Sequence, residues 1–169
     1  MARNIEIKAA IGNLQALLAQ VVKLCDQPPI ELDQDDIFFA CANGRLKLRS
    51  FSSSKGELIF YRRPDHQGPK ESFYLIAPTS APAQLGEILS QAFGQAGRVR
   101  KHRTLFLKDR TRIHIDQVEG LGAFLELEVV LKEGEPPEVG RQIAQELLNQ
   151  LGIGPEQLIE GAYVDLLKE

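Results

Sequence analysis

Several segments of the chain place a charged residue at every second position, and these charged rows are of two kinds. One row holds Arg45, Lys47 and Arg49, and another holds Glu126 and Glu128 within an otherwise apolar run. Because side chains at i and i+2 of a strand share a face, each segment would present its charges on one side. Converging cations bind phosphate oxygens, and converging carboxylates bind Mg²⁺ or Mn²⁺. The pattern therefore predicts a site for a polyanion held together with a divalent metal.

The carboxylates are the candidate metal ligands. Glu126 and Glu128 are the strongest, because a charge inside so apolar a run needs a partner or a metal. Glu6 lies in the middle of an N-terminal strand-like segment, and Asp116 ends the segment before the Glu126 strand. Taken singly, each is explained as well by a solvated surface charge. His114 precedes them on a strand, where a structural role is favoured over that of a general acid or base.

The cations recur with the same two-residue phase in one segment after another. Arg binds phosphate oxygens in pairs, and Lys acts as a mobile point charge. Several of them, together with a metal, would neutralise a triphosphate and the charge that develops at phosphorus. Each cation alone is better explained by a solvated face, but the whole set is not. The set comprises Lys8, Arg45, Lys47, Arg49, Arg63, Lys70, Lys101, Arg103, Arg110 and Arg112.

The composition is that of one globular domain and excludes several classes of function. The 169 residues are 43% hydrophobic and 25% charged, without an apolar run long enough for a membrane span. The net charge of −3 argues against a nucleic-acid-binding surface. Cys25 and Cys41 lack disulfide or zinc spacing, and the N-terminus lacks a signal peptide, so we expect a cytoplasmic protein. P-loop, dinucleotide-binding, nucleophile-elbow and zinc-protease motifs are all missing from the sequence.

The elements that must position these residues are about eight strands with helices between them. Most links are too short for parallel crossovers, so we expect antiparallel hairpins, one of them turning at Asn43-Gly44. Residues 26–35 are expected to form a loop. The predicted helices are 14–25, 82–93 and 137–151, with a short one near 155–159. The predicted strands are 3–9, 36–40, 45–51, 58–62, 71–76, 98–107, 111–117 and 123–131.

Two arrangements of the charged rows are open. In an ordinary half-exposed sheet the charges face solvent, and the pattern alone favours this arrangement. In the other, amphipathic helices cover the apolar rows from outside, and the charged rows line the interior of a closed barrel.

The ordered series of motifs resembles the CYTH superfamily, the triphosphate tunnel enzymes that include class IV adenylyl cyclases and thiamine triphosphatases. Residues 4–8 stand where the family has ExExK, and residues 34–39 resemble its QxDxYF segment. Residues 44–49 match GRLKLR, Lys101-His102-Arg103 matches a K-x-R pair, and residues 110–128 match the most specific block. The likeness runs from Ala2 to Leu167 and is nearest to the class IV adenylyl cyclase-like branch.

The resemblance implies an α+β fold, with a charged tunnel through an eight-stranded antiparallel β-barrel and helices packed outside. It implies one CYTH domain over residues 1–169, and Mg²⁺ or Mn²⁺ as the cofactor. Carried over by position, the metal candidates are Glu6, Asp116, Glu126 and Glu128. The triphosphate-binding candidates are Lys8, Arg45, Lys47, Arg63, Lys70, Lys101, Arg103 and Arg112. The candidate catalytic residues are Glu6, Lys8, Glu126 and Glu128.

The expected function is that of a metal-dependent class IV adenylate cyclase, which converts ATP to cyclic AMP and pyrophosphate. The alternatives are a thiamine, inorganic or nucleoside triphosphatase, and a module that binds triphosphate or polyphosphate without turnover. Asn4 replaces the first Glu of ExExK, which removes a charge from the metal site. Phe38 replaces a Tyr that is linked to hydrolysis in the thiamine triphosphatase branch. The expected partner is ATP, thiamine triphosphate or tripolyphosphate, without nucleic acid or membrane, and a homodimer fits this kind of barrel.

Overall fold

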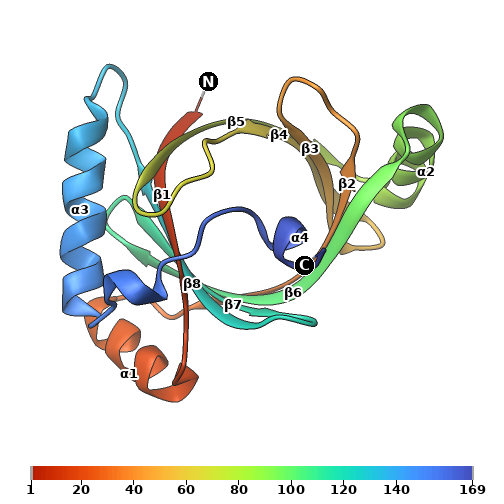
Figure 1. The fold of residues 1–169 in the computed structure, drawn as a ribbon. Helices are drawn as coiled ribbons and strands as arrows, with labels where there is room; N and C mark the ends of the chain where they lie inside the picture. Colours follow the sequence, from red (N-terminus) through yellow and green to blue (C-terminus); the bar gives the residue numbers. More distant parts are fainter. Residues whose placement is uncertain (1, 169) are drawn as a thin grey trace.

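The computed structural model describes residues 2–168 and shows a closed eight-stranded barrel (Figure 1). Around the barrel the strands follow the order β1-β5-β4-β3-β2-β6-β7-β8, and every neighbouring pair is antiparallel. The predicted barrel is therefore confirmed. The strands are β1 (Ala2–Ala10), β2 (Ile30–Phe39), β3 (Arg45–Ser52), β4 (Lys55–Arg62), β5 (Lys70–Thr79), β6 (Gln95–Lys108), β7 (Thr111–Val118) and β8 (Gly122–Val130).

Three helices pack against the outside of the barrel: α1 (Leu14–Leu24), α2 (Pro82–Phe93) and α3 (Pro137–Gln150) (Figure 1). Their bounds agree with the predicted ones to within one residue. Asn13 caps α1 by accepting a hydrogen bond from the Ala16 amide at 3.1 Å. Within residues 2–168, none of the helices has the length and apolar character needed to cross a membrane.

The expected loop at 26–35 is wrong over its second half, because β2 begins at Ile30. Its acidic residues have low strand propensity, but they lie opposite cations of β6 on the outer face. Asp35 accepts two hydrogen bonds from Arg98, and His102 lies 2.8 Å from Asp33. Such cross-strand pairs stabilise a strand whose own sequence does not favour one.

The hydrophobic core lies between the barrel and its helices, not inside the barrel. The outward rows of β1 and β8, which include Ile5 and Leu127, are fully buried together with Val21 of α1 and Leu148 of α3. On the opposite side, Leu48 of β3 belongs to a cluster that α2 completes. With the apolar rows covered from outside, the alternate charged rows face the interior. The second of the two arrangements, the barrel with a charged lumen, is the one observed.

A C-terminal segment closes one end of the barrel. After the short 3₁₀ helix η1 (Pro155–Gln157), the chain crosses the opening and forms α4 (Tyr163–Leu166) (Figure 1). Tyr163 and Val164 pack against apolar residues at the strand ends, among them Phe38 and Phe124. A side chain at Gly97 would collide with Val164, so a glycine permits this close approach. The barrel therefore has one closed end and one open end.

Gly140 tests how closely α3 packs on the barrel. A Cβ at this position would lie 2.5 Å from Ile5 Cγ1 and 2.8 Å from Leu131 Cδ2. We expect Gly140→Ala to lower the free energy of unfolding by about 1–2 kcal/mol, because the helix or its neighbours must shift. At Gly12 nothing lies within 4 Å, so Gly12→Ala is the matched control and should change stability by less than about 1 kcal/mol. Urea denaturation measures both, and equal effects would contradict the close packing.

Candidate active site

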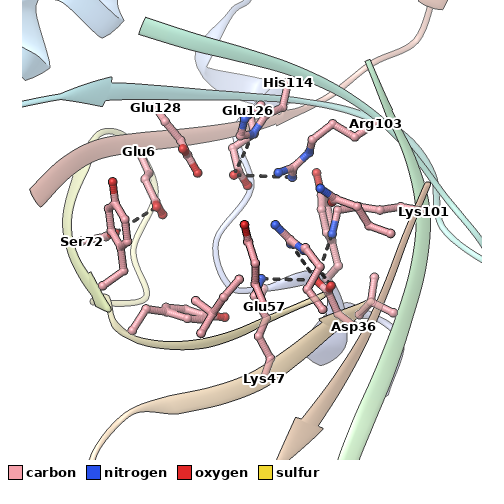
Figure 2. Close-up of a pocket in the computed structure, with 18 of the residues that line it drawn as sticks. Glu6, Asp36, Lys47, Glu57, Ser72, Lys101, Arg103, His114, Glu126 and Glu128 are labelled. Atoms are coloured by element: carbon pink, nitrogen blue, oxygen red, sulfur yellow. Dashed lines mark hydrogen bonds and ion pairs between the residues drawn. The ribbon is translucent and has the colours of Figure 1, made fainter. Parts of the chain in front are cut away.

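The barrel encloses a cavity of about 330 Å³, lined by inward side chains from all eight strands (Figure 2). It brings together most of the residues that the sequence predicted for the site. Those lining it are Glu6, Lys8, Lys47, Arg63, Lys101, Arg103, Arg112, Glu126 and Glu128. The other three, Arg45, Lys70 and Asp116, lie outside its lining.

One wall of the cavity is acidic and is formed by the adjacent strands β7, β8 and β1. His114 lies opposite Glu126 in the β7–β8 register, and Glu6 lies opposite Glu128 in the β1–β8 register. One ligand atom each from His114, Glu126 and Glu128 lies within 4.8 Å of the others. The buried Nδ1 of His114 is 3.5 Å from Glu126 Oε1 and forms no hydrogen bond with any described residue. A free imidazole nitrogen beside two carboxylates fits a divalent cation such as Mn²⁺ or Mg²⁺.

The two buried carboxylates of this wall respond to their surroundings in opposite ways. Burial raises the pKa of Glu6, and the nearby charge of Glu128 adds to this effect. Burial acts in the same direction on Glu126, but His114, Lys8 and Arg103 together hold the pKa of Glu126 well below its usual range. Glu126 is therefore the stably charged member of the pair, and Glu6 is the one that more readily holds a proton.

The opposite wall is cationic and is centred on Asp36 of β2. Arg49 of β3 donates two hydrogen bonds of 2.8 Å to the Asp36 carboxylate. Lys101 Nζ of β6 lies 3.2 Å from Asp36 Oδ2, and Lys47 Nζ of β3 lies 3.3 Å from the same oxygen. Figure 2 shows Asp36, Lys47 and Lys101 across the cavity from the acidic wall. An anion in the cavity would therefore lie between cations on one side and a candidate metal site on the other.

Three further cations each have a carboxylate partner within the cavity. Arg63 donates to Glu6 at 2.9 Å, Arg112 donates to Glu128 at 2.9 Å, and Lys8 Nζ lies 3.8 Å from Glu126. These pairs connect different strands and hold long side chains in place without a ligand.

Asp116 does not join the metal-ligand cluster. Its two oxygens accept hydrogen bonds of 2.7 and 2.8 Å from Arg103, and the Tyr163 hydroxyl donates another at 2.9 Å. Although burial opposes it, the Arg103 guanidinium lowers the pKa of Asp116 to about 2. Asp116 thus orients Arg103 and attaches α4 to the barrel.

Arg45 and Lys70 contact chain segments near the closed end. Arg45 pairs with Asp165 of α4 through two hydrogen bonds and also lies 3.9 Å from Asp65. Lys70 is 1% exposed, and its Nζ donates to the His66 carbonyl at 2.9 Å. Neither contact requires a phosphate.

The family of the chain follows from this barrel and its motifs. The model of the CYTH domain matches residues 2–163. The chain belongs to the CYTH domain family. A Methanocaldococcus jannaschii protein, named as a candidate adenylate cyclase, is 32% identical over 170 residues, which cover 96% of this chain and 97% of that protein.

Solved structures share the CYTH barrel at lower sequence identity. A Pyrococcus horikoshii protein is 22% identical with a TM-score of 0.86, over 97% of this chain and 99% of its own. A Hippeastrum protein, described as a candidate adenylyl cyclase with a dominant triphosphatase activity, is 16% identical with a TM-score of 0.69. That match covers 99% of this chain and 95% of the Hippeastrum chain. These likenesses establish the fold.

Asn4 and Phe38, the two residues that depart from the family motifs, both have defined positions in the barrel. Asn4 lines the cavity, and its buried Oδ1 has no hydrogen-bond partner within residues 2–168, so it presents a free carbonyl oxygen to the cavity. Phe38 is buried against the apolar residues near α4. The first departure therefore leaves a neutral oxygen donor in place of a carboxylate, and the second adds apolar surface at the closed end.

Sequence reasoning missed three contributors to the site. Asp36 occurs in the QxDxYF-like segment at the same inward phase as Gln34, a signal that could have identified it. His114 was assigned a structural role, although it shares the inward phase of Arg112. Tyr163, whose ring centroid lies 4.1 Å from Lys8 Nζ, belongs to a segment with no strand periodicity to indicate where it packs.

The buried lysines predict how stability depends on pH. Burial lowers the pKa of Lys101 to about 7 and that of Lys8 to about 8. Above pH 7 the unfolded chain binds more protons at these sites than the folded protein, so stability should rise with pH. We expect Lys101 to contribute roughly 2 kcal/mol of added stability between pH 7 and pH 9, in buffer free of polyanions. Urea unfolding should show this rise, and Lys101→Met should flatten it. The exposed-site variant Lys55→Met should keep the wild-type slope, and a flat wild-type profile would contradict the prediction.

Proposed function

We propose that this protein is a metal-dependent enzyme that acts on an organic triphosphate in the manner of a class IV adenylyl cyclase. The observation that carries the proposal is the pair of opposed walls in the cavity. The cations around Asp36 face the cluster of His114, Glu126 and Glu128 across a space of about 330 Å³. This volume is within the usual range for small-molecule sites.

The proposed roles follow from the two walls. Lys47, Arg49 and Lys101 would bind the phosphate oxygens, with Lys8, Arg63 and Arg112 on the sides of the cavity. Glu126, Glu128 and His114 would hold Mg²⁺ or Mn²⁺, with Glu6 beside them. Such an ion neutralises charge on a transferring phosphoryl group and lowers the pKa of an attacking hydroxyl. The fixed cations would orient the chain of phosphates and stabilise the charge on the leaving group.

The open end supports an organic triphosphate over inorganic tripolyphosphate. At the end opposite α4, the cavity is lined by Leu32, Phe51, Ile76 and Leu105, and Tyr74 lies among them. Apolar and aromatic side chains suit a nucleobase or another flat organic group. The phosphates would then lie deeper, among the charges.

Two reactions are compatible with this arrangement. In the cyclase reaction the ribose 3′-hydroxyl attacks the α-phosphorus and pyrophosphate leaves. In the hydrolase reaction water attacks the terminal phosphorus. We favour the cyclase because the Methanocaldococcus relative carries that name and because Phe38 stands where the hydrolytic branch has Tyr. The same fold in the Hippeastrum protein has a dominant triphosphatase activity, so the fold alone does not select the reaction.

The proposal extends to the setting of the protein. We propose a single CYTH domain that works in the cytoplasm on a small-molecule triphosphate, with no nucleic acid or membrane as partner. The two free cysteines, Cys25 and Cys41, are consistent with a reducing compartment.

A product assay tests the proposal. ATP, thiamine triphosphate and tripolyphosphate are incubated separately with Mg²⁺ or Mn²⁺, and cyclic AMP, pyrophosphate and orthophosphate are resolved. We expect cyclic AMP and pyrophosphate in equal amounts from ATP, and we expect Glu126→Gln to lower the rate at least about 100-fold. Glu138→Gln, on the exposed face of α3, is the control. Orthophosphate without cyclic nucleotide would replace the cyclase with a triphosphatase. No product from any substrate would overturn the enzymatic proposal and leave a binding module.

A further inference from the structure

One carboxylate in the cavity is shared by three cations. Asp36 is 1% exposed, and its Oδ2 lies 2.8 Å from Arg49 NH2, 3.2 Å from Lys101 Nζ and 3.3 Å from Lys47 Nζ. These cations come from β3 and β6, the two strands that flank β2 in the barrel. Elsewhere in the described cavity, Arg63 and Arg112 each have a carboxylate partner of their own. Below about pH 7, the value to which burial lowers the pKa of Lys101, these three cations outnumber the single carboxylate, and the wall around Asp36 carries an excess of positive charge.

The Asp36 oxygen has the surroundings expected for a phosphate oxygen. An oxygen surrounded by a guanidinium and two ammonium groups is typical of polyanion sites. Asp36 supplies such an oxygen from the protein itself. Its charge offsets only one of the three cations, so the remaining charge is available to a ligand.

We propose that Asp36 is a resident counter-ion: it positions Lys47, Arg49 and Lys101 for the triphosphate and limits how tightly they retain it. This inference rests on the proposed function, because it requires a polyanion to enter the cavity. Asp36 is a positioning residue, since it acts through the three cations and does not itself contact the ligand.

Removal of the Asp36 charge should have opposite effects on the free and the liganded protein. Without the carboxylate, the three cations repel one another at pH 6, and the pKa values of Lys47 and Lys101 fall further, so the free protein loses stability. A bound polyanion would then supply the missing negative charge and gain affinity. Phosphorylated product would also be held more tightly, and slower product release lowers turnover.

Asp36→Asn, which keeps the size of the side chain, provides the test. Titration calorimetry with tripolyphosphate at pH 6, where Lys101 is charged, should show binding at least about tenfold tighter than in the wild type. The melting temperature should fall without ligand, and the rise on adding tripolyphosphate should be larger. With ATP and metal, KM and kcat should both decrease. A purely structural Asp36 would lower stability and weaken binding together.

Two control variants test whether the change in binding is specific to Asp36, or follows from any loss of negative charge or of stability. Asp35→Asn makes the same change in net charge on the same strand but removes an ion pair on the outer face. Leu48→Ala creates a cavity in the core beneath α2, outside the tunnel. Neither variant should bind tripolyphosphate more tightly than the wild type. Tighter binding by either variant would show that the effect is not specific to Asp36.

A double variant, Asp36→Asn with Arg49→Gln, restores the local balance of charge. It should recover stability relative to Asp36→Asn and bind tripolyphosphate within about threefold of the wild type. If Asp36→Asn does not fold, the double variant carries the test alone. The counter-ion role would be overturned if Asp36→Asn bound tripolyphosphate no more tightly than the wild type. It would also be overturned if the double variant bound tripolyphosphate at least about tenfold more weakly than the wild type. If the wild type binds neither tripolyphosphate nor ATP, the proposed function fails instead.

Discussion

The structure depends on one electrostatic constraint: a barrel whose lumen is charged must neutralise those charges without bulk water. Ion pairs between side chains of different strands do this. Arg112 of β7 pairs with Glu128 of β8, Arg103 of β6 pairs with Asp116 of β7, and Arg63, directly after β4, pairs with Glu6 of β1. Such buried pairs contribute little net stability, because the cost of desolvation offsets their attraction. These pairs instead orient the long side chains. A bound ligand would then replace one member of a pair as the partner of the other.

The same constraint explains why the apolar core is outside the barrel. If the lumen is polar, the strands must bury their other face, and α1, α2 and α3 provide the cover. The tight contact of α3 with β1 at Gly140 is one consequence. The helices thus stabilise the barrel, and the cavity is left free for chemistry.

Strand periodicity predicted the strands and which side chains share a face, but by itself it favoured charges that face solvent. The closed barrel with its charged lumen was predicted from the resemblance to the CYTH family. The sequence predicted less about residues whose interaction partners come from distant segments of the chain. The acidic start of β2 resembles a loop until the cations of β6 are placed opposite it. The attachment of Asp116 to Arg103 and Tyr163 also depends on contacts across the barrel. Periodicity identifies a face, but it does not identify which charges on that face pair with each other and which remain free.

The closed end bears on the reaction. Because α4 covers that end, a triphosphate would enter through the open end, and its organic group would remain near Phe51 and Leu105. The terminal phosphate would then lie deepest, near Lys8 and Lys101, whose ammonium groups lie over the Tyr163 ring. Phe38, Phe124 and Tyr163 belong to one buried apolar cluster in that region. The α-phosphorus would lie nearest the open end, where the ribose hydroxyl of the same molecule is the closest nucleophile. Closure of one end by α4 therefore constrains the direction in which a triphosphate would enter, while the fold by itself does not select between intramolecular attack and hydrolysis.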